Sequence, residues 1–148
     1  MRTLPKRSIA SPRRTSGPFA HGLRGRRGQS LVELALTLPV LLLLTAGVLD
    51  LAHVFSVAGI CANAAREGAR YGATNPTDTD GITTRVIDEA AGAPLTLTAS
   101  QVTVTTPSGT TSGSPVTVQV TNKVALMLAP ALGLAQPIIV RQATMAIF

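Results

Sequence analysis

The feature that most constrains this chain is a long uncharged apolar stretch behind a strongly basic N-terminus. No Asp, Glu, Lys or Arg occurs between Glu33 and Asp50, and as a helix these residues would extend about 24 Å at about 1.5 Å per residue. Starting at Leu31 brings the length to about 28 Å, close to the roughly 30 Å hydrocarbon core of a bilayer. The stretch therefore predicts a single membrane-spanning helix over residues 31–49, with a buried helix of a soluble core as the alternative.

The charge of the chain is divided between two parts of opposite sign. The net charge of +6 conceals a leader, residues 1–28, with eight basic residues and no acidic one, followed by a body with five basic and seven acidic residues. Because Lys and Arg next to a membrane span stay in the cytoplasm, we expect a cytoplasmic leader and an extracytoplasmic body. A nucleic-acid-binding arm or a transit peptide fits less well, since no folded basic domain follows and the next stretch is too hydrophobic.

Composition excludes several function classes. The chain has one Cys, two His, no Trp and one Tyr among 148 residues. A single Cys cannot form an intramolecular disulfide or a multi-Cys metal site, and few aromatic residues are available to stack on bases or sugars. The sequence contains no phosphate-binding loop, nucleophile elbow or metal-ligand spacing. We therefore expect neither an enzyme nor a cofactor or metal.

The second half of the sequence predicts a small α+β domain. A turn cluster at 75–81 ends the long helix, and Asp80 is the expected cap of a short helix over about 81–91, whose inner face carries Ile82, Val86 and Ala90. Alternating Val residues within 96–106 and 116–120 predict an antiparallel hairpin, and 138–148 a further strand. The predicted fold is α+β: a long N-terminal helix over residues 29–73 packs on a small antiparallel β-sheet of three or four strands in residues 74–148.

The junction between leader and helix carries a recognisable motif. It reads RRGQSLVE from Arg26 to Glu33, and it resembles the class III signal of type IV prepilins. That resemblance implies cleavage by a prepilin peptidase between Gly28 and Gln29, which removes the leader and leaves the apolar helix in the product. Glycine also gives a protease an unhindered backbone.

A second motif lies at the far end of the predicted helix. Residues 64–71 read AAREGARY, which resembles the signature of TadE-like proteins, minor pseudopilins of the Tad/Flp tight-adherence pilus system. The resemblance runs from Arg27 to Tyr71 and includes the acid at Asp50, although His53 stands where a basic residue is frequent. The helix-motif residues that it marks are Asp50, Arg66, Glu67, Gly68 and Arg70.

Several single residues of the helix have competing interpretations. For Glu33, the prepilin resemblance implies pairing with the new α-amino group of Gln29 in a neighbouring subunit, and a capping box with Ser30 is the local alternative. Pro39 predicts a kink. Asp50 and His53 are expected to form a surface pair at the membrane interface, with a contact to a partner pilin as the alternative.

Beyond the apolar stretch, Cys61 is expected to be buried as a small apolar residue, and an intermolecular thiol is the alternative. The charged residues of the AAREGARY motif have two interpretations. They end a solvated helix, or they flank a small-residue face that packs against the sheet or against other pilins.

Taken together, the sequence predicts a TadE-like minor pseudopilin in the cytoplasmic membrane, single-pass with its N-terminus in the cytoplasm. Its expected partners are a prepilin peptidase, other pilins or pseudopilins of the Tad system and the lipid bilayer, without nucleic acid. The alternative is a membrane-anchored or secreted binding domain with an ordinary signal-anchor and no role in a pilus.

Overall fold

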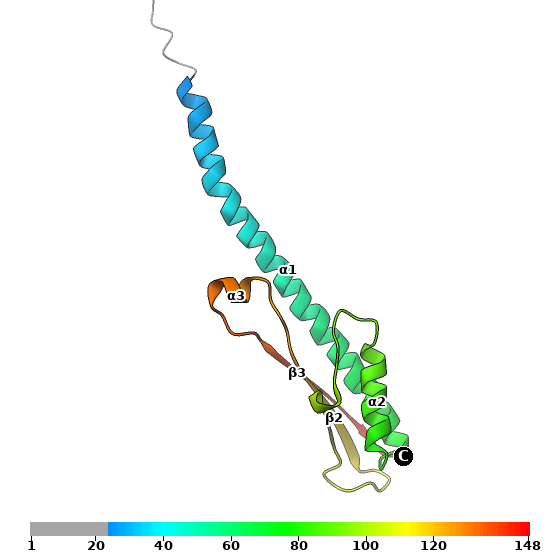
Figure 1. The fold of residues 1–148 in the computed structure, drawn as a ribbon. Helices are drawn as coiled ribbons and strands as arrows, with labels where there is room; N and C mark the ends of the chain where they lie inside the picture. Colours follow the sequence, from blue (N-terminus) through cyan, green and yellow to red (C-terminus); the bar gives the residue numbers. More distant parts are fainter. Residues whose placement is uncertain (1–23) are drawn as a thin grey trace, which may run out of the picture. The chain divides into compact units, whose positions relative to one another are not determined.

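The computed structural model describes residues 24–148 and is dominated by one long helix, α1, over Arg24–Thr74 (Figure 1). The predicted helix over 29–73 is present, but it begins earlier, within the expected leader, because Arg residues are good helix formers and outweigh the two glycines. Ser30 consequently lies inside α1, and the predicted N-terminal capping box of Ser30 and Glu33 is wrong. The rest of the leader, residues 1–23, lies outside the described residues.

Two compact units divide the chain after Pro39, inside α1. The helix assignment continues through Pro39, whose ring removes one intrahelical hydrogen bond. The second unit, residues 40–148, contains the C-terminal part of α1 and every other element of the fold.

A short helix, α2 over Thr79–Ala90, follows the turn after α1. Its buried residues are Ile82, Val86 and Ala90, as the spacing of apolar residues predicted. Its cap differs from the prediction: the carboxylate of Asp78, not Asp80, accepts a hydrogen bond from the backbone N–H of Gly81 at 2.9 Å. Asp78 is the residue that satisfies an N–H group of the first turn, and this starts the helix two residues earlier than expected.

Three antiparallel strands form one sheet in the order β1-β2-β3, with β1 at Val102–Thr105, β2 at Pro115–Lys123 and β3 at Ile138–Ala146. The predicted hairpin is present, with Val102 opposite Val120. The first strand is shorter than its alternating pattern because a 3-10 turn, Ala99–Gln101, precedes it. There the side chain of Gln101 accepts a hydrogen bond from the backbone N–H of Thr98 at 2.8 Å, which closes the turn.

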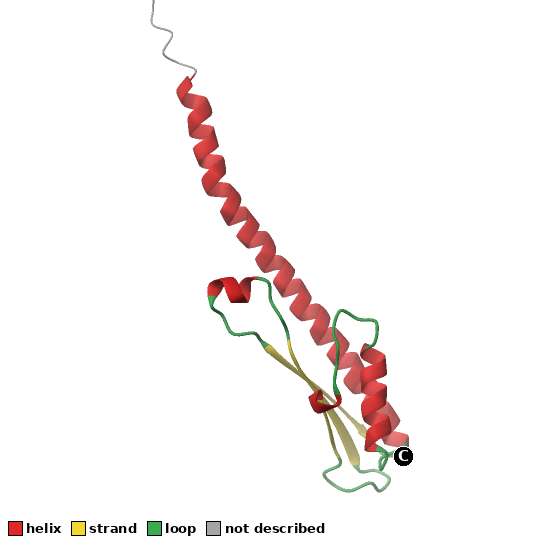
Figure 2. Cartoon of the chain, in the orientation of Figure 1, coloured by secondary structure: helices red, strands yellow, loops and turns green. Residues whose placement is uncertain are grey.

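The core lies between the C-terminal part of α1, helix α2 and one face of the sheet (Figure 2). From α2 and β2 it receives branched aliphatic side chains, whereas α1 contributes mainly small residues. The buried residues of α1 are Val57, Ala58, Cys61, Ala64, Ala65, Ala69 and Ala73. The expected cover of the apolar sheet face by the end of α1 is confirmed.

The link between β2 and β3 contains a third helix, α3, over Leu128–Leu132. No helix was predicted between the strands at 116–120 and 138–148. Gly133 ends α3 in the left-handed conformation, φ 66°, which glycine adopts without steric cost. The C-terminus returns to the end of α1, where the backbone N–H of Phe148 donates to the carbonyl of Ala73 at 3.0 Å.

Candidate functional site

The apolar part of α1 is a candidate membrane anchor. Helix α1 is long and apolar enough to cross a bilayer, and its most apolar stretch has no buried residue. Its exposed large apolar side chains form an almost continuous series: Leu31, Val32, Leu34, Leu36, Leu38, Val40, Leu41, Leu42, Leu43, Leu44, Val48, Leu49 and Leu51. Such a surface is unfavourable in water and is the composition that a hydrocarbon environment requires.

The predicted processing junction lies in the first unit. Gly28 and Gln29 are helical residues of α1 and are exposed, and a Cβ on Gly28 would meet nothing within 4 Å. Glu33 is exposed as well, one helical turn further on, and its backbone carbonyl accepts a hydrogen bond from the hydroxyl of Thr37 at 2.7 Å. The Gly28–Gln29 junction and the Glu33 side chain are thus both accessible on α1.

Asp50 occupies a different place from the one predicted. Its side chain is buried, and each carboxylate oxygen accepts a backbone N–H from the start of α3. Met127 donates to Oδ1 at 2.8 Å and Leu128 to Oδ2 at 2.9 Å. The expected surface pair with His53 is wrong, because both oxygens are used by amides 77 and 78 residues away in sequence.

The motif of residues 64–71 divides between two faces of α1. Ala64, Ala65, Gly68 and Ala69 point into the core, whereas Arg66 and Arg70 are exposed. Arg66 donates to Oδ1 of Asn63 at 3.0 Å. The small-residue face therefore serves the packing of α1 on its own domain, and the arginines remain on the outside.

Gly68 explains why this face needs small residues. A Cβ on Gly68 would overlap Cγ2 of Val86 in α2 and would lie 3.2 Å from Cγ1 of Val118 in β2. Four residues later, a Cβ on Gly72 would lie 3.0 Å from both Ile82 and Val116. At Gly68 the backbone of α1 thus approaches α2 so closely that a Cβ would require Val86 to move, and at Gly72 a Cβ would make tight contacts with α2 and the sheet.

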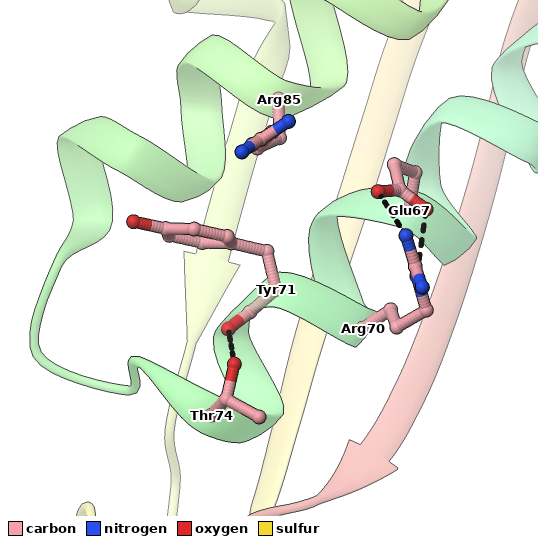
Figure 3. A pocket seen from close by; sticks show the side chains of 5 residues that line it. All are labelled: Glu67, Arg70, Tyr71, Thr74 and Arg85. Carbon is pink, nitrogen blue, oxygen red and sulfur yellow. Dashed lines mark hydrogen bonds and ion pairs between the residues drawn. The ribbon is translucent and has the colours of Figure 1, made fainter.

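Glu67, Arg70 and Tyr71 of the motif line a cleft of about 260 Å³ together with Thr74 and Arg85 (Figure 3). Arg70 binds the carboxylate of Glu67 through two hydrogen bonds, 2.7 and 2.9 Å, and these lower the pKa of Glu67. The guanidinium of Arg85 lies 5.4 Å from the ring centre of Tyr71, a cation–π distance.

Tyr71 also connects this cleft to the start of α2. Its hydroxyl donates to Oδ2 of Asp78 at 2.8 Å, which raises the pKa of Tyr71. The N–H of Gly81, and after it the Tyr71 hydroxyl, lower the pKa of Asp78. Sequence reasoning missed this contact, although the Asn-Pro turn between the helices is the signal that brings Tyr71 and Asp78 together.

Cys61 is fully buried in the core, as the sequence predicted. Burial raises the pKa of its thiol. It belongs to the same hydrophobic core as Val120 and Val124, so the side chain acts as a small apolar residue of α1.

Comparison with known protein families gives a match for most of helix α1. Residues 28–70 match the family model of TadE-like proteins. This segment is TadE-like. The TadE-like match begins at the predicted cleavage residue and ends at the last arginine of the motif, so it confirms the resemblance seen in the sequence. No curated protein and no solved structure matches the chain significantly.

TadE-like proteins are associated with the Tad pilus system and are typically structural, and the match covers residues 28–70 of the 148-residue chain. The structure explains what the TadE-like segment contributes to this chain. It combines an exposed apolar helix, the Asp50 carboxylate that binds the start of α3, and a face of small residues against which α2 and the sheet pack.

Proposed function

We propose that the chain is a minor pseudopilin that a prepilin peptidase cleaves between Gly28 and Gln29, and that it acts in assembly of a Tad/Flp-type pilus or secretion apparatus. The observation that carries the proposal is the TadE-like match over residues 28–70 on a helix whose apolar residues are exposed. The leader would lie in the cytoplasm and the β domain outside the membrane, as the basic leader favours.

The proposed cleavage has a physical consequence for assembly. It would remove the leader with its eight positive charges and create an α-amino group on Gln29 close to the membrane surface. Glu33 follows by one helical turn and is exposed. A carboxylate at that depth is costly unless it is paired, and the new amine of a neighbouring subunit supplies the pair and reduces the cost of removing both charges from water.

Determination of the mature N-terminus tests the processing step. We expect mass spectrometry of membrane and sheared-surface fractions, from cells that make the full chain with its pilus system, to find a terminus at Gln29. Gly28→Leu should leave the leader attached, whereas Gly25→Leu adds the same bulk in the leader and should be cleaved normally. An uncut wild-type chain, or a terminus at Ala65, would favour the alternative of an anchored or secreted binding domain.

The role of Glu33 is tested separately from cleavage. Glu33→Ala should be cleaved like the wild type but should be depleted from the assembled apparatus, measured as loss from the sheared fraction or loss of co-purification with other pilins. Glu89→Ala is the matched control, since it removes an exposed carboxylate of α2 that lies outside the TadE-like motif. If Glu33→Ala assembles as well as the wild type, the pairing role is wrong.

A further inference from the structure

The link between β2 and β3 is strongly apolar and exposed. No charged residue occurs from Val124 to Val140, and several large side chains in this link face outward. Met127 is 75% exposed, Leu132 52% and Leu134 60%. The stretch differs from the outer face of the sheet, where Thr117 and Thr144 share a hydrogen bond of 2.8 Å.

Helix α3, in the middle of this link, is held by hydrogen bonds at both of its ends. Asp50 receives the N–H groups of Met127 and Leu128 at the start of α3. At its end, Gly133 adopts a positive φ and the N–H of Leu134 donates to the carbonyl of Ala129 at 2.8 Å, a closure typical of helix C-termini. The outward position of its leucines is therefore built into the fold.

The position of the link along α1 indicates what covers it. Asp50 is the first charged residue after the uncharged stretch, and Leu128 Cδ1 lies 3.9 Å from the position of a Cβ on Gly47, one turn earlier. The exposed Val48, Leu49 and Leu51 belong to the same part of α1. Helix α3 thus lies beside the last turn of the candidate membrane span.

From this continuity we infer that residues 124–137, which we call the α3 link, insert into the outer interface of the bilayer beside α1, with phospholipid as their partner. The inference rests on the membrane insertion in the proposed function. Apolar side chains that continue the lipid-exposed surface of a span are stabilised by the same transfer from water. The nearest charged residues on either side of the link, Lys123 and Arg141, are exposed and basic, as suits contact with phosphate headgroups.

The absence of Trp from the chain allows a direct test with single-Trp variants. The full-length protein with Leu134→Trp is reconstituted in vesicles of phosphatidylcholine and phosphatidylglycerol, with or without brominated acyl chains. We expect brominated lipid to quench the Trp and its emission to shift to shorter wavelength than in the unfolded chain. Leu132→Trp provides a second position and should behave in the same way.

Two reference variants make the result decisive. Leu42→Trp places the probe inside the span and should be quenched, whereas Ser112→Trp places it in the exposed loop at the other end of β2 and should not. Quenching at Leu42→Trp without quenching at Leu134→Trp and Leu132→Trp would overturn the inference and leave the anchor intact. No quenching at any position would overturn membrane insertion itself, and the inference with it.

A second copy of the chain would give a different pattern. The emission of Leu134→Trp would then shift with protein concentration, and brominated lipid would not quench it. That outcome would also overturn the lipid contact, because it would show the α3 link to be an interface between subunits.

Discussion

Gly68 of α1 lies against Val86 of α2 so closely that a Cβ atom on the glycine would overlap Cγ2 of the valine. Both residues are in the described core, and Val86 is fully buried. Because packed interiors have little room to yield, the closeness of these two helices depends on the absence of one methyl group.

Gly68→Ala is therefore expected to destabilise the β domain. Overpacking of a core typically costs about 1–3 kcal/mol, and this exceeds the gain of about 0.5–1 kcal/mol that Ala normally brings to a helix interior. Thermal unfolding of the purified full chain in detergent, followed by the fluorescence of its single Tyr, measures the effect. We expect a lower Tm.

Gly59→Ala is the matched control for this substitution. Gly59 lies in the same helix, and a Cβ there would meet nothing within 4 Å. Its substitution should leave the Tm unchanged or raise it slightly. Equal Tm values for Gly68→Ala and Gly59→Ala would contradict the packing role of Gly68.

The Asp50 carboxylate is expected to fix the α3 link to α1. Asp50→Ala removes the acceptor of two backbone N–H groups, and hydrogen bonds to a charged group contribute about 1.5–3 kcal/mol. Amide hydrogen exchange of Met127 and Leu128 should accelerate strongly in this variant, more than exchange in β2. Asp50→Asn keeps one acceptor oxygen and should have a smaller effect.

An exposed acid serves as the comparison for Asp50. Asp88→Ala removes a carboxylate from the surface of α2 and should leave exchange at Met127 and Leu128 as it is in the wild type. Slow exchange of both amides in Asp50→Ala would show that another group holds the link.

Sequence reasoning recovered the elements better than the contacts between them. The uncharged stretch, the spacing of Ile82, Val86 and Ala90 and the alternating valines are local patterns, and each gave the correct type of element. The partner of Asp50 could not be derived in the same way, because it lies 77 residues away in a link without a helical pattern. His53, three residues away, was the only partner that local spacing offered.

The packing partner of the small residues in the TadE-like motif could not be predicted from the sequence either. Their composition predicts close packing of α1 but not the surface against which it packs, since alanine and glycine suit a sheet, a neighbouring helix or another subunit equally well. Only the three-dimensional contacts of Gly68 and Gly72 with Val86, Ile82 and Val116 show that the chain's own domain occupies this face.

Asp78 makes the start of α2 sensitive to acid. Its pKa lies below its ordinary value of 3.8, owing first to the N–H of Gly81 and then to the hydroxyl of Tyr71. A depressed pKa in the folded state means that this contribution to stability is fully present above the ordinary value. It is lost as the pH falls through the folded value. We expect the Tm to decrease below about pH 4, in keeping with an ordinary Asp pKa of about 3.9.

Asp78→Asn tests the assignment of this acid sensitivity. The amide oxygen can still accept from Gly81, but it does not titrate, so the decrease in Tm with acid should be smaller than in the wild type. Asp80→Asn changes an exposed carboxylate two residues away that makes neither of these hydrogen bonds, and it should retain the wild-type acid dependence. Identical pH profiles for both variants would refute the role of Asp78.

Cys61 should report opening of the core between α1 and the sheet. The thiol is fully buried and its pKa is raised by that burial, so both access and the thiolate fraction at neutral pH are reduced. We expect N-ethylmaleimide to modify the folded full chain far more slowly than the chain in denaturant. Ser112→Cys in a Cys61→Ala background provides an exposed thiol for comparison and should react rapidly when folded.

Because Gly68→Ala strains the same core, it should accelerate modification of Cys61, whereas Gly59→Ala should not. A wild-type Cys61 that reacts as fast as the thiol at position 112 would show that this core is open in solution.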